Sequence, residues 1–247
     1  MDYNEKFYEE LASTNDFALD HLAEFSDRTV IYATRQTKGH GRFERKWISS
    51  NAKNIYTSII LKPKIKLDEN CILANLTQYL CVILAETFEK YGVKASIKWP
   101  NDILINGKKI SGILAQTSVK NGELQGVVLG VGINLNMTQE ELVNIDQPAT
   151  SLNIETRKSI DKKEFSKNLF DLFFSEYEEF LQKGFSLIKS RYCSRCDFIS
   201  KEICVKNPDK ARVGIAQAIN DDGSLKIKFN DKNESETIRI GDVTWNY

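Results

Sequence analysis

The sequence predicts an α+β protein with a small β-barrel at its C-terminal end. Between residues 68 and 91, apolar residues recur at the i, i+3, i+4, i+7 spacing of an amphipathic helix that packs on a sheet. Several apolar segments between residues 96 and 136, separated by turn residues, predict consecutive strands. Beyond residue 197 the apolar runs become short and alternating, a pattern typical of small barrels.

The N-terminal elements are predicted to be one helix and two strands. Ser13 to Asp16 is an N-cap cluster that begins the helix. Residues 28–34 and 54–61 are rich in β-branched and aromatic side chains, which predicts buried strands. Residues 35–53 between them are polar and basic, without helical or strand periodicity. Because long irregular segments in compact domains are usually functional, this loop is the first candidate for a site.

The centre of the chain contains two strong turn signals. Asn106-Gly107 and Asn121-Gly122 each predict a two-residue hairpin turn. The strands around these turns are predicted at residues 96–99, 103–105, 109–118 and 124–136. A helical region follows at residues 162–191. We therefore predict two domains, a larger one over residues 1–196 and the small barrel over residues 197–247.

Composition and charge favour a cytoplasmic protein that binds neither DNA nor membranes. Lys plus Arg and Asp plus Glu both number 34, so no global basic field points to DNA or to an anionic membrane. The N-terminus lacks the apolar core of an export signal, and no segment approaches the roughly 20 apolar residues of a spanning helix. The five cysteines are irregularly spaced, and Cys193-Ser-Arg-Cys196 has no histidine nearby in sequence, which favours ordinary thiols in a reducing cytosol.

The first candidate segment for chemistry spans residues 36–47. It contains two glycines, which let a backbone approach a ligand closely and point its N–H groups at phosphate oxygens. Its basic and aromatic residues include Arg42, Arg45, Lys46 and Trp47. The cations are suited to hold a polyphosphate or an acyl-phosphate anhydride, and the indole to cover an aromatic base. The alternative interpretation is a solvated basic loop without a ligand.

The second candidate segment begins with Lys-Trp-Pro-Asn-Asp at residues 98–102. Asn101 and Asp102 can present oxygens to a magnesium ion or a ribose, although the same residue types are common in plain turns. Lys109 opens the return strand of the predicted hairpin. It either reaches inward to pair with a carboxylate or faces solvent.

The third candidate segment is a strand that carries Gly130 and Gly132. Glycines inside a strand often mark a ligand that lies against the backbone. Asn134 follows, and its amide is able to hydrogen-bond a base or a sugar. The alternative interpretation is a β-bulge or a tight sheet contact.

In their order and spacing, these motifs resemble the biotin protein ligase family. The motifs are Ser-Thr-Asn at residues 13–15, the Gly-His-Gly-Arg loop ending in Arg-Lys-Trp at 39–47, Lys-Trp-Pro-Asn-Asp at 98–102, Lys-Ile-Ser-Gly-Ile-Leu at 109–114 and Gly-Val-Gly-Ile-Asn at 130–134. The resemblance covers essentially the whole chain. It implies a catalytic domain similar to class II aminoacyl-tRNA synthetases and lipoate ligases, with a mixed sheet and flanking helices, followed by an SH3-like barrel.

The activity implied by the resemblance is ATP-dependent ligation of biotin to a biotin carboxyl carrier protein domain. Because a carboxylate is a poor electrophile, the first step makes biotinyl-5′-AMP and pyrophosphate from biotin and MgATP, and an acceptor lysine attacks this anhydride in the second step. Many family members also carry an N-terminal DNA-binding repressor domain. Since the Ser-Thr-Asn motif begins at residue 13, the sequence predicts a monofunctional enzyme without one. Monomer and homodimer both remain open.

The resemblance also implies a role for each motif residue. Lys109 and Arg42 are the implied catalytic residues: Lys109 binds the biotin carboxylate, and Arg42 holds the acyl phosphate and the phosphates of the nucleotide. The residues implied in biotin binding are Ser13, Thr14, Asn15, Gln36, Gly39, Gly41, Arg42, Lys109, Gly112, Gly130 and Gly132. Those implied in nucleotide binding are Arg42, Arg45, Lys46, Trp47, Asn101, Asp102 and Asn134, with Asp102 as the candidate ligand for Mg²⁺.

The loop departs from the family pattern Gly-Arg-Gly-Arg-x-Gly-Arg at two positions. His40 replaces the first arginine, and Glu44 replaces the later glycine. We expect residues 37–50 to be mobile without ligand and ordered over the adenylate, because the anhydride must be shielded from water. The alternatives to biotin ligation are lipoate ligation, a non-catalytic biotin or nucleotide sensor, and a DNA-binding repressor.

Overall fold

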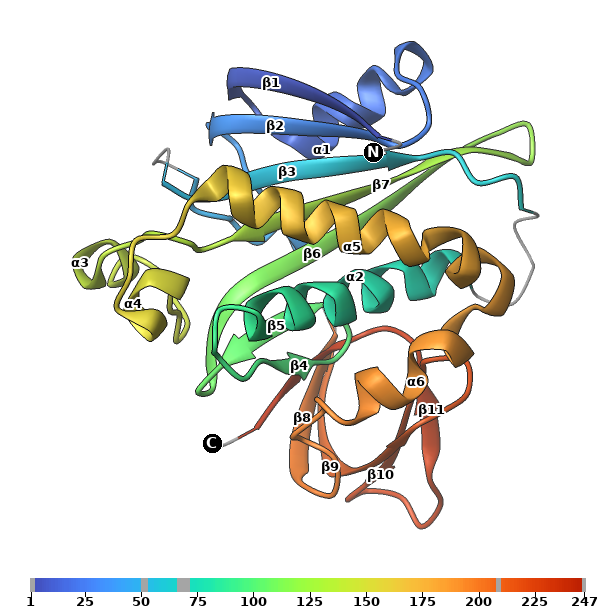
Figure 1. Cartoon of the computed structure of the whole chain (residues 1–247). Coiled ribbons are helices and arrows are strands. Elements are labelled where there is room, and N and C mark those ends of the chain that lie inside the picture. Colours follow the sequence, from blue (N-terminus) through green and yellow to red (C-terminus); the bar gives the residue numbers. More distant parts are fainter. Residues whose placement is uncertain (1–2, 50–52, 66–71, 208–209, 246–247) are drawn as a thin grey trace.

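The computed structural model describes residues 3–49, 53–65, 72–207 and 210–245. Its central sheet has seven strands in the order β1-β2-β3-β7-β6-β5-β4 (Figure 1). β1 pairs with β2 in parallel, and each of the other neighbouring pairs is antiparallel, which confirms the predicted mixed sheet. The strands are β1 (Asn4–Leu11), β2 (Thr29–Gln36), β3 (Ile55–Leu61), β4 (Ser96–Lys98), β5 (Asp102–Ile105), β6 (Lys108–Lys120) and β7 (Glu123–Ile133).

Helices cover both faces of this sheet. α2 (Ile72–Glu89) and α5 (Lys162–Lys183) lie against one face, and α1 (Thr14–Asp20) lies against the other (Figure 1). Successive residues of β2 alternate between the two layers. Val30 belongs to the large core beneath α2 and α5, whereas Ile31 packs in the smaller cluster beneath α1. The period-2 geometry of a strand explains this division.

α2 is buried along most of its length because it lies between the sheet and α5. Tyr79 of α2 stacks on Phe180 of α5, with ring centroids 4.5 Å apart. The helix predicted over residues 68–91 is therefore confirmed from residue 72 onward. Its predicted first turn falls within residues 66–71, which lie outside the described residues.

The local signals at the first helix and at the hairpins are confirmed. Ser13 is the N-cap of α1, and its side-chain Oγ accepts a hydrogen bond from the backbone N–H of Asp16 at 3.3 Å. Both residues of each predicted turn, at 106–107 and 121–122, have positive φ. That backbone conformation matches the twist of antiparallel strands, so each Asn-Gly pair directly joins neighbouring strands of the sheet.

Several elements differ from the prediction. β1 was not predicted, nor were the short helices α3 (Gln139–Leu142) and α4 (Leu152–Thr156). The helical region predicted at residues 162–191 is two helices, α5 and α6 (Phe185–Cys193). The break lies at Gly184, whose φ of 58° leaves the helical region.

The C-terminal segment forms a second, antiparallel sheet in the order β11-β10-β9-β8-β12. Its strands are β8 (Glu202–Asn207), β9 (Lys210–Ile219), β10 (Leu225–Phe229), β11 (Glu236–Ile238) and β12 (Asp242–Thr244). The predicted short strands are thus confirmed, while closure into an SH3-like barrel and a domain boundary at residue 196 stay predictions. Ile227 and Val243 of this sheet belong to the same apolar core as α2.

Two further observations concern membrane-spanning helices and cysteines. No helix within the described residues is long and apolar enough to cross a membrane. The described cysteines, at positions 81, 193, 196 and 204, are free thiols.

Candidate active site

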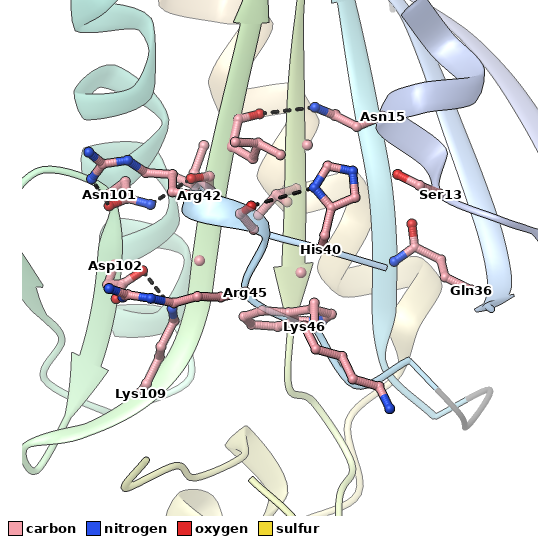
Figure 2. Close-up of a pocket in the computed structure, with 18 of the residues that line it drawn as sticks. Ser13, Asn15, Gln36, His40, Arg42, Arg45, Lys46, Asn101, Asp102 and Lys109 are labelled. Carbon is pink, nitrogen blue, oxygen red and sulfur yellow. Dashed lines mark hydrogen bonds and ion pairs between the residues drawn. The ribbon is translucent and has the colours of Figure 1, made fainter. Parts of the chain in front are cut away.

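A pocket lies on the face of the large sheet that carries α1. Its wall comes from α1, β6, β7 and the loop between β2 and β3 (Figure 2). The lining residues are Ser13, Thr14, Asn15, Gln36, His40, Gly41, Arg42, Arg45, Lys46, Trp47, Asn101, Asp102, Lys109, Gly112, Ile113, Leu114, Gly130, Val131, Gly132, Gln147 and Asp242. Ser13, Asn15 and Gln36 lie on one side of the pocket, and Arg42, Arg45, Asn101, Asp102 and Lys109 lie on the other (Figure 2).

Glycines on two paired strands make room for the pocket. Gly112 of β6 faces Gly132 of β7 directly in the ladder, and Gly130 lies on the same face of β7. A Cβ atom at Gly130 would overlap the side chain of Asn15, and one at Gly132 would overlap the indole ring of Trp47. The pairing of β6 with β7 is regular at these glycines, so they mark a close approach rather than a bulge.

The polar end of the pocket is a connected hydrogen-bond cluster. The backbone N and the Oγ1 of Thr14 both donate to Oε1 of Gln36, at 2.7 and 3.1 Å. Nε2 of Gln36 donates to Oγ of Ser49 at 3.0 Å. The buried hydroxyl of Ser58 lies 2.8 Å from Oγ1 of Thr14 and 2.9 Å from Oδ1 of Asn15. These contacts fix a set of donors and acceptors that suits an uncharged polar ligand group such as a urea.

The loop that closes the pocket folds back on itself. The backbone N of Trp47 donates to the carbonyl of Gly39 at 2.9 Å, and His40 and Lys46 form an antiparallel bridge between them. The predicted mobile segment reaches Ser50, which lies outside the described residues.

The loop places the side chain of Trp47 against the sheet. Its indole lies against Gly132, and the Nζ of Lys109 is 5.5 Å from the ring centroid, within the range of a cation–π contact. The indole Nε1 is buried and has no hydrogen-bond partner among the described residues. The ring therefore has a flat face and an unused donor at the pocket.

His40 ties the loop to α1 through an ion pair. Its Nε2 lies 3.0 Å from Oδ1 of Asp16. Burial by itself lowers the pKa of His40, but the hydrogen bond and the charge of Asp16, with a smaller effect of Glu44, raise the pKa above its ordinary value. The histidine that replaces a family arginine thus keeps a cationic form within reach of neutral pH.

The charged end of the pocket centres on Asp102. Its Oδ1 lies 2.8 Å from the Nζ of Lys109 (Figure 2). Its Oδ2 lies 3.8 Å from the Nζ of Lys98. All three side chains are largely buried. Burial lowers the pKa of Lys98, and the charge of Asp102 opposes that shift. Of the two interpretations of Lys109, the inward pairing with a carboxylate is therefore confirmed.

Two arginines of the loop meet a carboxylate from the C-terminal sheet. The Nη1 of Arg42 donates to Oδ1 of Asn101 at 3.1 Å, to the carbonyl of Gly241 at 3.2 Å and to Oδ1 of Asp242 at 3.0 Å. The Nη1 of Arg45 lies 2.5 Å from Oδ2 of Asp242. The pocket therefore draws on both sheets.

Comparison with known proteins identifies the family. Residues 8–134 match the biotin/lipoate A/B protein ligase family. The chain belongs to this family. The matched range contains α1, the loop, the charged cluster around Asp102 and both glycine-bearing strands. The resemblance predicted from the motifs is thus confirmed, and the chain is a ligase-family enzyme.

Relatives within this ligase family extend over most of the chain. The bifunctional ligase/repressor BirA of Bacillus subtilis is 31% identical over 218 residues, which cover 86% of this chain but 66% of BirA. The biotin--[acetyl-CoA-carboxylase] ligase of Paracoccus denitrificans is 28% identical over 221 residues, which cover 87% of this chain and 90% of that protein. The biotin protein ligase from Aquifex aeolicus, solved in complex with biotin and ATP, superimposes with a TM-score of 0.78 at 26% identity, covering 98% of this chain and 97% of that one.

The pocket brings together nearly all residues that the sequence assigned to the ligase site. Gly39 and Asn134 are not among its lining residues. Asn134 is 3% exposed and its Nδ2 donates to the carbonyl of Thr150 at 3.1 Å, so its contact with adenine stays a prediction. Sequence reasoning missed Gln147 and Asp242, because no local motif marks either position.

Proposed function

We propose that this chain is an ATP-dependent biotin protein ligase. It condenses biotin with MgATP to biotinyl-5′-AMP and pyrophosphate, and then transfers biotin to one lysine of a biotin carboxyl carrier domain. One observation carries the proposal: a single pocket joins a neutral hydrogen-bonding end to an end where Arg42, Arg45 and Lys109 gather around two carboxylates. That is the arrangement needed to bind a ring urea, to neutralise a carboxylate and to hold phosphates beside it.

In the first step the protein supplies position and charge. Ser13, Thr14 and Gln36 bind the ureido ring of biotin, and the valeryl chain runs over the glycines of β6 and β7. The carboxylate of biotin replaces the carboxylate of Asp102 as the partner of the Lys109 ammonium group. Arg42 holds the α-phosphate, so the two anions meet in line and the charge that develops on them is neutralised.

In the second step the loop acts as a lid. Trp47 covers the adenine, while Arg42 and Arg45 hold the phosphate of the adenylate away from water until the acceptor lysine arrives. Support comes from the hairpin-like fold of the loop and the position of Trp47 over Gly132. The bond from the carbonyl carbon to the phosphate oxygen breaks, the amide bond forms, and AMP leaves.

The lid is tested by limited trypsin digestion with and without biotinyl-5′-AMP. We expect cleavage after Arg42, Arg45 and Lys46 to be fast in the free protein and about tenfold slower with the adenylate, because a closed loop is withdrawn from protease. Equal cleavage rates under both conditions would remove the lid from the mechanism.

A resident magnesium ion does not fit the described donor set. No group of three or more His, Cys, Asp or Glu side chains is placed to hold a metal within the described residues. The predicted ligand Asp102 is paired with two lysines instead. Magnesium therefore enters the reaction as part of the substrate MgATP, and the role of Asp102 toward it stays a prediction.

Several finer features belong to the same proposal. The acceptor is a biotin carboxyl carrier domain, and the C-terminal sheet is an SH3-like barrel. The enzyme is monofunctional and cytoplasmic, and native mass spectrometry distinguishes its monomer from a homodimer. A gel shift on operator-like DNA tests the absence of repressor activity: a shift at nanomolar protein would refute the monofunctional assignment.

The deciding experiment offers the protein two acids and two acceptors. Protein and MgATP are incubated with biotin and a biotin carrier domain, or with lipoate and a lipoyl domain, and each carrier is weighed by intact mass spectrometry. We expect the gain of one biotin, lost or slowed in the Lys109→Ala and Arg42→Ala variants. A gain with lipoate alone would move the chain to the lipoate branch of its family. No gain with either would favour a non-catalytic sensor.

A further inference from the structure

Asp242 is the first residue of β12, yet its side chain points into the pocket on the other sheet. It is 8% exposed as a residue. Each of its carboxylate oxygens faces a different guanidinium group: Oδ1 accepts from Arg42 at 3.0 Å and Oδ2 lies 2.5 Å from Arg45. One carboxylate thus bridges the two loop arginines.

The contact of Asp242 with both arginines reduces the electrostatic repulsion between them. Two guanidinium groups that must hold the same phosphate repel each other before the phosphate arrives. A carboxylate between them compensates this repulsion: it accepts a hydrogen bond from Arg42 and forms an ion pair with Arg45. Arg45 needs such a partner most, because its side chain is 61% exposed and a long exposed side chain otherwise samples many rotamers. Arg42 is already held from the other side by Asn101.

Attachment of the C-terminal sheet does not explain the bridge. Other hydrogen bonds already dock that sheet onto the catalytic sheet. Gln78 and Trp99 both donate to the carbonyl of Gly223, at 2.8 and 3.1 Å. A carboxylate at an anion site also costs electrostatic energy once the nucleotide binds, so a purely structural contact would be better placed elsewhere.

We propose that Asp242 is a positioning residue for nucleotide binding, which holds Arg42 and Arg45 in the geometry that the phosphates of ATP require. The inference deepens the proposed ligase function and rests on it. The phosphates of the bound nucleotide replace the Asp242 carboxylate as the partner of both guanidinium groups. After AMP leaves, Arg42 and Arg45 pair with Asp242 again. The C-terminal sheet thereby contributes to a step whose motif residues all lie in the catalytic sheet and its loop.

The test compares Asp242→Asn, which keeps the shape and removes the charge, with Asp242→Glu and a matched control. The control is Asp231→Asn, in the turn that follows β10. Oδ1 of Asp231 lies 2.9 Å from the Nη2 of Arg212, and neither residue lines the pocket. Pyrophosphate release is measured against ATP at saturating biotin and carrier domain. Biotin affinity is measured separately by calorimetry, and Tm by thermal unfolding.

We expect Asp242→Asn to raise the KM for ATP about tenfold, the effect of one lost charge-assisted contact, with kcat reduced less. Biotin affinity stays unchanged, Asp242→Glu recovers most of the loss, and Asp231→Asn behaves as wild type. An unchanged KM for ATP would overturn the proposal. A lower KM would overturn it as well, by showing that Asp242 competes with the nucleotide. If biotin binding weakened as much as ATP binding and the Tm fell as well, the role of Asp242 would be merely structural. If the wild-type protein itself attaches no biotin, the proposed function fails instead.

Discussion

At the scale of single residues, Lys109 and Asp102 form an ion pair in the pocket, at the point where we propose that the biotin carboxylate binds. Both side chains are largely buried, and their charged atoms are 2.8 Å apart. We expect Lys109→Ala to slow pyrophosphate release from ATP and biotin about 100-fold, because one preorganised cation at the reacting carboxylate is lost. The measurement is a coupled pyrophosphate assay at saturating ATP.

Lys167→Ala is the control for this change. Lys167 is an exposed lysine that pairs with Asp171 on α5, far from the pocket lining. It should leave the rate within twofold of wild type, as exposed i,i+4 pairs contribute little. A Lys109→Ala enzyme that also kept its rate within twofold would show that the biotin carboxylate is bound elsewhere.

His40 and Asp16 predict a pH dependence of stability. The pKa of His40 in the folded chain lies above its unfolded value of about 6.5. The pair therefore stabilises the fold fully below about pH 6.5, and this contribution is lost as the pH rises through the folded pKa. We expect His40→Gln to destabilise the protein by less than about 1 kcal/mol at low pH, since solvent screens the pair, and by almost nothing at high pH.

Urea unfolding across this pH range measures the effect of His40. Asp16→Asn should remove the same pH-dependent difference, and the double variant should lose no more than either single one. A destabilisation by His40→Gln that grew with pH would mean that the folded pKa is lowered, and the ion pair would then not be the cause.

At the scale of elements, the two glycines of β7 that line the pocket, Gly130 and Gly132, each lie against a different side chain of it. β7 is held by β3 on one side and β6 on the other, so it has little freedom to move away from an added methyl group. We expect Gly132→Ala to displace Trp47 and thus to raise the KM for ATP and the rate of loop cleavage by trypsin. Gly130→Ala should displace Asn15 instead and weaken biotin binding.

The two alanine variants serve as controls for each other. Both add the same methyl group to the same strand, two positions apart, and calorimetry with biotin and the ATP dependence of the rate distinguish them. If both variants weakened biotin binding and raised the KM for ATP to the same extent, the two ends of the pocket would not be separable. The assignment of Trp47 to the nucleotide end would then be wrong.

The elements also show where the sequence was informative. α2 and the two Asn-Gly hairpins were predictable, because periodicity and turn chemistry are local properties. β1 was not, because Asn4–Leu11 carries charges at half of its positions and becomes a strand through parallel pairing with β2. The site followed the same rule: Lys109 and Gly132 belong to recognisable motifs, whereas Asp242 reaches Arg42 across 200 residues and carries no local signal.

At the scale of the whole molecule, the two sheets share one apolar core. Ile227 of β10 and Val243 of β12 belong to the same buried cluster as Leu76 of α2. Because these described residues belong to one continuous apolar cluster, we infer that both sheets unfold together. The contact between the sheets is made specific at the turn around Gly223, whose carbonyl accepts hydrogen bonds from the side chains of Gln78 and Trp99.

The turn at Gly223 gives the last prediction. Its φ of 78° is unfavourable for any other residue, and a Cβ there would also overlap Gln78. We expect Gly223→Ala to lower the free energy of unfolding by about 3 kcal/mol, from backbone strain and overpacking together. Gly122 is the matched control, because its φ is 80° but nothing lies within 4 Å of an added Cβ, so Gly122→Ala should cost about 1 kcal/mol from strain alone. Urea unfolding monitored by tryptophan fluorescence measures both. Equal costs would show that Gly223 is needed only for its backbone conformation, and a second transition in Gly223→Ala would show that this turn is what makes the two sheets unfold as one.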